Sequence, residues 1–173
     1  MRSRTVVVMV ALTLLGSLLL ATGCQKAAEE ATEAAIEGAT GIDVETDEDK
    51  VTIEGEDGSS VEIQSGGDLA EDFPSDAPVY DAPVESSGRI GTEGALSWTV
   101  VQTTSDDFDQ VVAYFEGELA SEGWTVNGNT SNTADGSSMA IIGAEKDSLQ
   151  YTVSVQQDEG QDVSVAISVN QSQ

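Results

Sequence analysis

The chain has very few residues of the kinds on which many protein functions depend. Its 173 residues include no histidine, one cysteine and 6 lysines or arginines, and only 5% of them are aromatic. Zinc, haem and iron–sulfur sites draw on sets of histidine and cysteine, and a serine or cysteine catalytic triad requires a histidine. A single cysteine also excludes an internal disulfide framework. The sequence therefore predicts no catalytic, metal or cofactor-binding residue, and a protein that is not an enzyme.

Acidic residues, in contrast, are abundant. The chain carries 32 of them and has a formal net charge of -26. It would repel DNA and RNA, whose binding needs a basic surface to neutralise phosphates. Six basic residues cannot pair with 32 acidic ones. The repulsion among the unpaired acids must therefore be screened by salt or tolerated by the fold. Because this composition resembles that of proteins from salt-loving microbes, we hypothesise that the protein works in a saline medium.

The N-terminus has the parts of a secretory signal sequence. Arg2 and Arg4 supply a positive start, and an apolar run follows from residue 6 to residue 20. This run is shorter than the roughly 20 residues that comfortably span a bilayer. We therefore predict a signal peptide over residues 1–23 that is removed. Its removal takes away two arginines and no acid, which changes the formal net charge from -26 to -28.

The residues Ala21-Thr22-Gly23-Cys24 resemble the lipobox of bacterial lipoproteins. The resemblance implies that Cys24 is the site of lipid attachment and that its lipid holds the protein to a membrane of the bacterial cell envelope. Ala21 departs from the family pattern, which prefers leucine at that place. Gln25 follows the cysteine where an aspartate would imply the inner membrane, so the resemblance implies the periplasmic face of the outer membrane. The alternative for Cys24 is an ordinary cysteine after an uncleaved anchor.

Three segments precede the main domain. Residues 24–41 are rich in alanine and glutamate, which are good helix formers, but they lack an apolar stripe, so we predict a helical or flexible tether. Residues 42–66 are acidic and contain two runs of alternating apolar and polar residues around Asp57-Gly58, which predicts a β-hairpin. Residues 67–83 contain adjacent glycines and all three prolines. We predict a linker there, because proline lacks a backbone donor and restricts the preceding residue.

Residues 84–173 have the strongest periodicity. Apolar residues recur with helical spacing from Phe108 to Leu119, and Gly123 is placed to end that helix. Strands are predicted at residues 96–100, 138–145, 150–156 and 162–169, with a further strand starting at Trp124. One helix with about five or six strands predicts an α+β domain, in which an antiparallel sheet packs on one amphipathic helix. One helix shields only part of such a sheet, so we expect the other face to be polar and solvated.

A second resemblance covers roughly residues 70–170. The run FPSDAPVY at residues 73–80, followed by Tyr114 and by the pair Gly123-Trp124, is similar to small, mostly uncharacterised domains of bacterial envelope lipoproteins. In those domains a proline-containing entry strand precedes a helix that ends in Gly-Trp. The resemblance implies a fold and an envelope location, and it transfers no catalytic residue.

Two acidic clusters are candidate sites for a hard cation such as calcium, which takes six to eight oxygen ligands. The first consists of Asp106, Asp107 and Asp109, and the second of Asp43, Glu45, Asp47, Glu48 and Asp49. The first cluster lies where the helix is predicted to begin. The helix dipole stabilises acidic side chains in the first turn, so these aspartates need no bound cation to explain them. The second lacks the glycine and the distal glutamate of an EF-hand loop. We therefore favour the helix N-terminus for the first cluster and a solvated charge run for the second.

The remaining polar and aromatic candidates have structural interpretations. A polar loop that ends in the turn Asp135-Gly136 is predicted to contain Asn127, Asn129, Asn132 and Asp135, with ligand binding as the less favoured alternative. Paired carboxylates can hydrolyse glycosides, but that chemistry also needs a deep cleft with aromatic residues that stack on sugars. Trp98 and Trp124 are too few to build such a cleft, and we predict both in the core.

These observations favour one function and leave one alternative. The favoured function is a lipid-anchored envelope lipoprotein whose α+β domain is structural or binds another envelope protein. The alternative is a lipid-anchored binding module for cations or a small cationic ligand, motivated by the acidic clusters. The predicted partners of the protein are the membrane, through the N-terminal lipid, and an envelope protein. Nucleic acid is excluded as a partner.

Overall fold

The computed structural model describes residues 42–46, 49–55, 58–92 and 94–171. In chain order its elements are β1 (Ile42–Thr46), β2 (Lys50–Gly55), β3 (Ser60–Ser65), β4 (Val84–Thr92), β5 (Ala95–Thr104), α3 (Phe108–Ser121), β6 (Thr125–Ala134), β7 (Ser137–Lys146), β8 (Leu149–Asp158) and β9 (Val163–Gln171). The predicted signal peptide, Cys24 and the tether lie outside these residues. Within the described part of the chain, no helix is long and apolar enough to span a bilayer.

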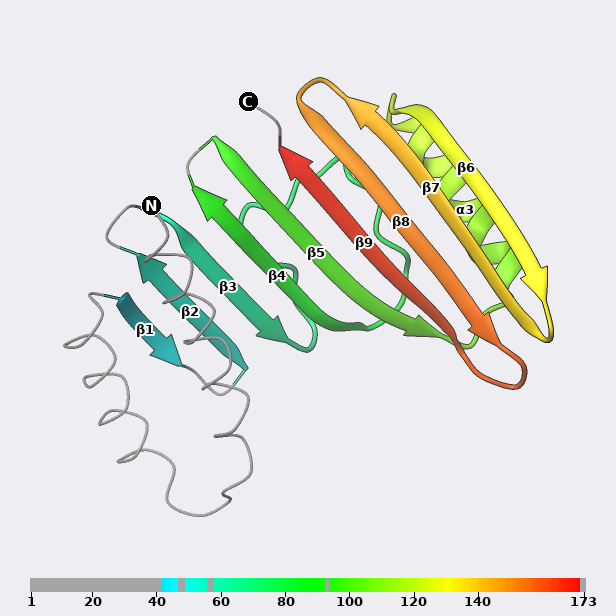
Figure 1. Ribbon diagram of the computed structural model, residues 1–173, viewed down its shortest axis with the longest axis horizontal. Helices are drawn as coiled ribbons and strands as arrows, with labels where there is room; N and C mark the ends of the chain where they lie inside the picture. Colours follow the sequence, from blue (N-terminus) through cyan, green and yellow to red (C-terminus); the bar gives the residue numbers. More distant parts are fainter. Residues whose placement is uncertain (1–41, 47–48, 56–57, 93, 172–173) are drawn as a thin grey trace, which may run out of the picture. The chain divides into compact units, whose positions relative to one another are not determined.

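The strands form a single antiparallel sheet in the order β1-β2-β3-β4-β5-β9-β8-β7-β6 (Figure 1). Two runs of consecutive hairpins build it. The first runs from β1 to β5, and the second runs inward from the edge strand β6 to β9. The two runs meet where β5 pairs with β9, with Val100 opposite Ile167. Helix α3 makes the connection from β5, in the middle of the sheet, to β6 at its edge.

Over the described residues the structure has the predicted α+β fold, with an antiparallel sheet and one helix, but the expectation of five or six strands is wrong. The sheet has nine strands. The hairpin of β2 and β3 continues the sheet, because β3 pairs with β4 and places Ile63 opposite Gly88. Strand β1 then adds to β2. A two-stranded hairpin is marginal in water, and joining an existing sheet supplies the pairing that it needs.

The helix forms where the apolar spacing predicts it. Phe108, Val111, Phe115 and Leu119 are its buried residues and share one stripe of the helix surface. The helix begins at Phe108, and Asp107 is its N-cap residue but makes no side-chain cap hydrogen bond. It ends before Gly123, whose φ of 80° is favourable for glycine.

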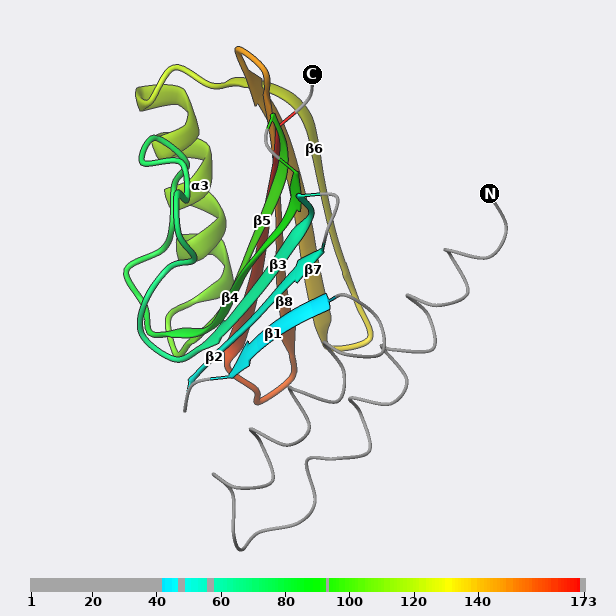
Figure 2. The ribbon, with the colours of Figure 1, turned by 90° about the vertical axis from the view of Figure 1, so that its left-hand side faces the viewer.

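The core lies on the side of the sheet that faces α3 (Figure 2). The buried stripe of the helix belongs to one cluster with inward-pointing side chains of β5, β7, β8 and β9, including Val100, Ile142 and Val153. Many of these side chains are fully buried. We call the side of the sheet that faces α3 the inner face and the opposite side the outer face.

The predicted polar loop before Asp135 is wrong, because residues 125–134 form the edge strand β6. The strand predicted to start at Trp124 is confirmed at its beginning, but all ten residues of β6 are exposed, so no apolar alternation predicts its continuation to Ala134. The turn itself is confirmed. Asp135 and Gly136 have φ values of 52° and 81°, which suit a two-residue hairpin turn between β6 and β7.

Candidate functional site

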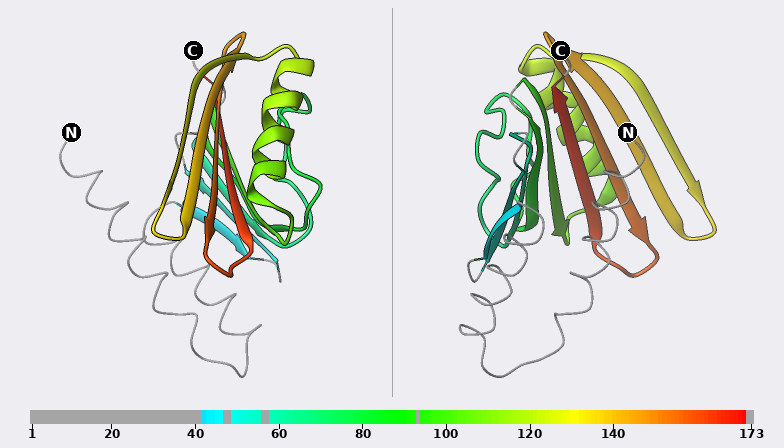
Figure 3. Two further views of the ribbon diagram at one scale, coloured as in Figure 1. Left: turned by 90° about the vertical axis from the view of Figure 1, so that its right-hand side faces the viewer. Right: turned by 60° about the vertical axis from the view of Figure 1, so that its left-hand side comes forward.

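The connection between β3 and β4, residues 66–83, lies on the same side of the sheet as α3 (Figure 3). We call it the crossing segment. It contains all three prolines of the chain and no strand. Its backbone carbonyls therefore have no ladder partners, although buried carbonyls need donors. Side chains of the sheet and the helix supply them.

Five side chains donate hydrogen bonds to carbonyl oxygens of the crossing segment. The bonds are Trp98 Nε1 to Glu71 (3.2 Å), Trp124 Nε1 to Asp76 (2.7 Å), Tyr151 Oη to Pro78 (2.8 Å), Tyr114 Oη to Val79 (2.7 Å), and Gln102 Nε2 to Tyr80 (2.9 Å) and Ala82 (2.7 Å). Both tryptophans are buried, as the sequence predicts. Their indole N–H groups also hold the crossing segment against the domain.

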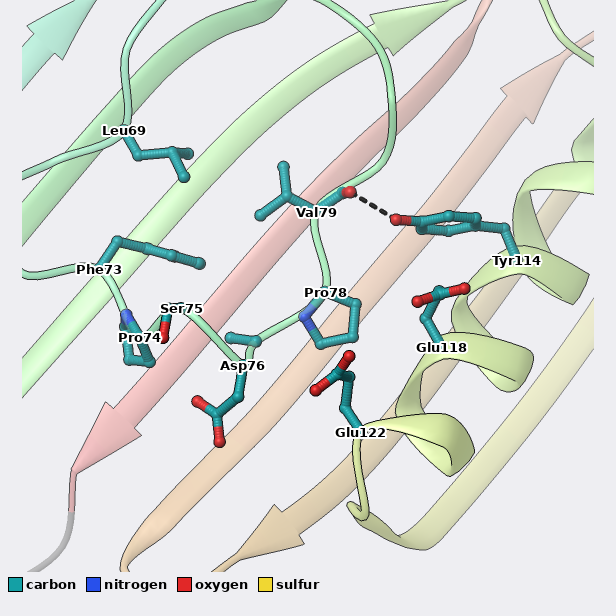
Figure 4. Close-up of a pocket in the computed structure, with 11 residues that line it drawn as sticks. Leu69, Phe73, Pro74, Ser75, Asp76, Pro78, Val79, Tyr114, Glu118 and Glu122 are labelled. Carbon is teal, nitrogen blue, oxygen red and sulfur yellow. Dashed lines mark hydrogen bonds between the residues drawn. The ribbon is translucent and has the colours of Figure 1, made fainter.

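An open depression of about 470 Å³ lies between the crossing segment and the C-terminal half of α3 (Figure 4). We call it the helix-side depression. Its apolar lining comes from the crossing segment: Leu69, Phe73, Pro74, Ala77, Pro78 and Val79. Its polar lining comes from Ser75, Asp76, Tyr114, Glu118 and Glu122. The depression thus combines an apolar surface with three carboxylates.

One of these carboxylates, that of Asp76, forms an ion pair with a described residue, and the other two form none. Lys146 Nζ lies 2.6 Å from Asp76 Oδ2 and also donates to the Glu122 carbonyl at 2.8 Å. Its hydrogen bond to Asp76 raises the pKa of the Lys146 ammonium, which therefore stays charged. The carboxylates of Glu118 and Glu122 form no ion pair with any described residue. The depression consequently keeps a local excess of negative charge.

Tyr114 fixes one wall of the depression. Burial, followed by the charges of Glu118 and Asp81, raises the pKa of its phenol, so the hydroxyl remains a donor to Val79. The ring packs edge-on against Tyr80, with ring centroids 4.9 Å apart. This arrangement holds an aromatic surface beside the two unpaired glutamates. An apolar surface next to negative charge suits a cation that carries carbon atoms, such as a basic side chain.

Residues 81–170 match the family model described as START domain-like. The match covers more than half of the chain. The chain belongs to this START domain-like family. No curated protein and no solved structure matches it.

The START domain-like match covers β4 to β9 and α3, and it begins after the residues that form the apolar wall of the depression. Tyr114, Glu118 and Glu122 lie within the matched range, whereas residues 69–79 precede it. The site is therefore built jointly by the family domain and by a segment in front of it. This arrangement depends on the side-chain donors that hold the crossing segment in place.

The acidic residues at the start of α3 do not come together as a cation site. Asp106 accepts a hydrogen bond from Tyr80 Oη at 2.7 Å, which raises the pKa of the tyrosine. Asp107 is the N-cap, and Asp109 lies in the first turn. These positions agree with the predicted helix N-terminus. Among the described residues, no group of three or more acidic or cysteine side chains is arranged to hold a metal ion.

Only some members of the second acidic cluster belong to the residues that the structure describes. Asp47 and Glu48 lie outside the described residues, and Asp43 and Glu45 belong to β1. The polar residues Asn127, Asn129 and Asn132 lie along β6, where Asn129 Nδ2 donates to Glu116 Oε1 at 2.6 Å. None of these residues lines the helix-side depression.

Sequence reasoning missed the acids that do line the depression: Asp76, Glu118 and Glu122. A signal for two of them exists, because Glu118 and Glu122 are one helical turn apart and must share a side of the helix. No sequence signal places them beside the crossing segment. That contact depends on hydrogen bonds between residues 35 to 73 positions apart, such as Tyr114 to Val79 and Tyr151 to Pro78.

Proposed function

We propose that this protein is a lipid-anchored bacterial envelope lipoprotein. The support is the apolar N-terminal run followed by Ala21-Thr22-Gly23-Cys24. Two or three acyl chains hold a protein stably to a membrane, and Gln25 favours the outer membrane. Mass spectrometry of the mature N-terminus tests the anchor. A diacylglyceryl-modified Cys24 is expected, and an intact residue 1 would overturn the localisation.

The START domain-like domain acts in this proposal as a protein-interaction module that binds a positively charged segment of an envelope partner. The helix-side depression carries the proposal. It offers an apolar surface of about six residues next to two carboxylates that have no cation of their own among the described residues. A lysine or arginine buries its aliphatic stem on such a surface while its charged end meets a carboxylate.

Binding fits the site better than catalysis. The depression is open, so it does not exclude water from a reacting group. The chain has no histidine to act as a base near neutral pH. We therefore propose a protein that is not an enzyme and needs no cofactor. A structural role in the envelope is compatible with the same interaction.

Affinity capture from detergent-solubilised membranes tests the interaction. The full chain is compared with Glu118→Gln/Glu122→Gln, which removes both unpaired charges from the depression. The matched control is Asp107→Asn/Asp109→Asn, which removes the same charge from the other end of the same helix. We expect the wild type and the control to retain a common partner and the depression variant to lose it. Equal retention by all three proteins would contradict the proposal.

A second candidate is a small cationic ligand, because a volume of about 470 Å³ is within the range of small-molecule sites. Calorimetric titration with spermidine tests this candidate, and calcium serves as a simple cation for comparison. Saturable heat with spermidine that is lost in Glu118→Gln/Glu122→Gln supports it. Absence of saturable heat at millimolar spermidine removes it and leaves the protein partner.

A further inference from the structure

The outer face of the sheet is almost free of charge, although the chain is strongly acidic. Its side chains are those that alternate with the core residues along each strand. The pairing register places a row of small or uncharged residues across it, namely Ile63, Gly88, Thr99, Ser168, Thr152 and Gly143. From β3 to β7, the described charged residues on or beside this face lie near strand ends, at Glu85, Glu145 and Asp158.

An apolar patch lies at each end of this row. Ile63 on β3 and Ile90 on β4 are each 53% exposed, and Met139 and Ile141 on β7 are 41% and 40% exposed. Ile90 lies opposite Val61, the outward neighbour of Ile63, so the first patch is continuous across two strands. Met139 and Ile141 are two residues apart on one strand and point to the same face. Large exposed apolar groups gathered on one face mark an interaction surface.

The charge distribution favours a second copy of this chain as the occupant. Two chains of charge -26 repel each other wherever acids meet, but contact through the outer faces keeps the acids of the helix side and the turns away from the interface. A basic partner would gain nothing from a neutral surface and would be drawn to the acidic side instead.

The outer face is also large enough. Strands lie about 4.8 Å apart and rise about 3.3 Å per residue, so the surface from β3 to β7 covers on the order of 700 Å². A standard interface buries about 800 Å² on each partner. The two sheets of a β-sandwich pack face to face with about 10 Å between them, so the outer faces of two copies can pack in the same way.

We propose that two copies of this protein associate through their outer faces. A two-fold axis between the two sheets that passes near the β5–β9 pair and is inclined to the strands lies midway between the two apolar patches. Strands β3 and β7 are equally far from that pair in the strand order, and the register places Met139 and Ile141 further along the strand direction than Ile63 and Ile90. This axis places the Ile63–Ile90 patch of one copy against the Met139–Ile141 patch of the other, and the same contact occurs twice. The small residues between the patches allow the two sheets to approach closely.

Sedimentation equilibrium of the full chain in density-matched detergent tests this proposal. The wild type is expected at twice the chain mass. Ile90→Glu and Ile141→Glu, one in each patch, should each raise the dimer dissociation constant at least tenfold. Leu69→Glu is the matched control, because Leu69 is a similarly exposed apolar residue on the helix side, at 38%, and it should remain dimeric. Thermal unfolding verifies that all variants are folded.

Cysteine cross-linking in membranes identifies the contact. The double variant Ile63→Cys/Ile141→Cys should give a disulfide-linked band of twice the chain mass, and Leu69→Cys should not. A monomeric wild type, or a dimer that both glutamate variants leave intact, would overturn the proposal. A cross-linked band at the mass of another protein would overturn it as well. The proposal would also be overturned if the chain is monomeric and both introduced thiols are protected from maleimide, because another part of the same chain then covers the outer face.

Discussion

The inner and outer faces of the sheet differ in what they contact and in where they carry charge. The inner face holds the buried core under α3, and acids such as Asp76, Glu118 and Glu122 surround it. From β3 to β7, the outer face carries small polar and apolar side chains, and its described acids lie near strand ends. The chain's acidity is therefore not spread evenly. From β3 to β7, the acidic residues lie on the side of the sheet that carries the helix and in the turns.

The apolar residues also change sides along the sheet. In β5, β8 and β9 they point toward the inner face, as Val100, Val153 and Ile167 do. In β2 and β3 the apolar residues point to the outer face, because Val61 pairs with the outward Ile90. The inward residues of this part are polar and include Glu62, which lies opposite Arg89. The first three strands thus bury little in the common core and present their apolar side to the outer face.

The largest expected effect compares one side chain from each face. Phe115→Ala removes a fully buried ring from under the sheet and should lower the free energy of unfolding by about 3–5 kcal/mol. Ile90→Ala, on the outer face, should change it by no more than about 0.5 kcal/mol at protein concentrations that keep the chain monomeric. Urea unfolding measures both. Equal losses would show that the outer face is packed as tightly as the inner one.

The next effect concerns the attachment of the crossing segment. Tyr151→Phe removes the buried hydroxyl that donates to Pro78 O at 2.8 Å. Leaving that carbonyl unpaired should destabilise the protein by about 1–3 kcal/mol. Tyr114→Phe removes an equivalent bond to Val79 in a partly buried position, so its effect should be smaller. A larger loss for Tyr114→Phe than for Tyr151→Phe in urea unfolding would contradict this account of the segment.

A pH-dependent effect is expected at Glu62 on the inner face. Burial raises the pKa of its carboxyl, but hydrogen bonds from Lys50 and from the Glu71 backbone N–H, with the nearby charges, lower it further than burial raises it. Lys50 Nζ lies 3.0 Å from Glu62 Oε2. A folded-state pKa below the unfolded value, about 4.3, adds stability above that value and loses it as the pH falls through the folded pKa.

Glu62→Gln should therefore lower the free energy of unfolding by about 1 kcal/mol at pH 7. The difference from the wild type should vanish on acidification below about pH 4. Denaturant unfolding between pH 3 and pH 7 measures it, with Glu54→Gln, an exposed acid on β2, as the control. A difference that stays constant across this range would contradict the assignment to Glu62.

The smallest effect tests the hypothesis of a saline medium. Salt screens repulsion between surface charges, and the Debye length falls from about 10 Å at 0.1 M to about 3 Å at 1 M. The wild-type melting temperature should rise with NaCl. Glu118→Gln/Glu122→Gln removes one repulsive pair spaced one turn apart, worth about 0.2–0.5 kcal/mol, so its melting temperature should rise less. A flat or falling wild-type curve would contradict the hypothesis.

Local patterns in the sequence predicted most elements of the fold. Helical spacing from Phe108 to Leu119 and strict alternation in β8 and β9 each reflect a single buried stripe or face, which a sequence displays directly. Strand β6 has no buried side chain, so no alternation marks it. The number of strands in the sheet depended on pairing between β3 and β4, which the 66–83 connection separates in sequence.

The candidate site was less predictable for a related reason. The acidic runs Asp106–Asp109 and Asp43–Asp49 are recognisable in the sequence because their members are close neighbours along the chain. The depression instead joins Phe73 and Asp76 to Glu118 and Glu122 through tertiary contacts. Such contacts are set by donors like Trp124 and Tyr151, whose partners cannot be read from spacing.

Hydrogen–deuterium exchange of the full chain with and without a lysine-rich peptide tests most directly that the acidic helix side is the binding side. The account predicts that the peptide slows exchange in residues 69–79 and 114–122. It also predicts that the peptide leaves β3, β4 and β9 unchanged and has no effect on Glu118→Gln/Glu122→Gln. Slower exchange in the outer-face strands, or in neither region, would contradict it.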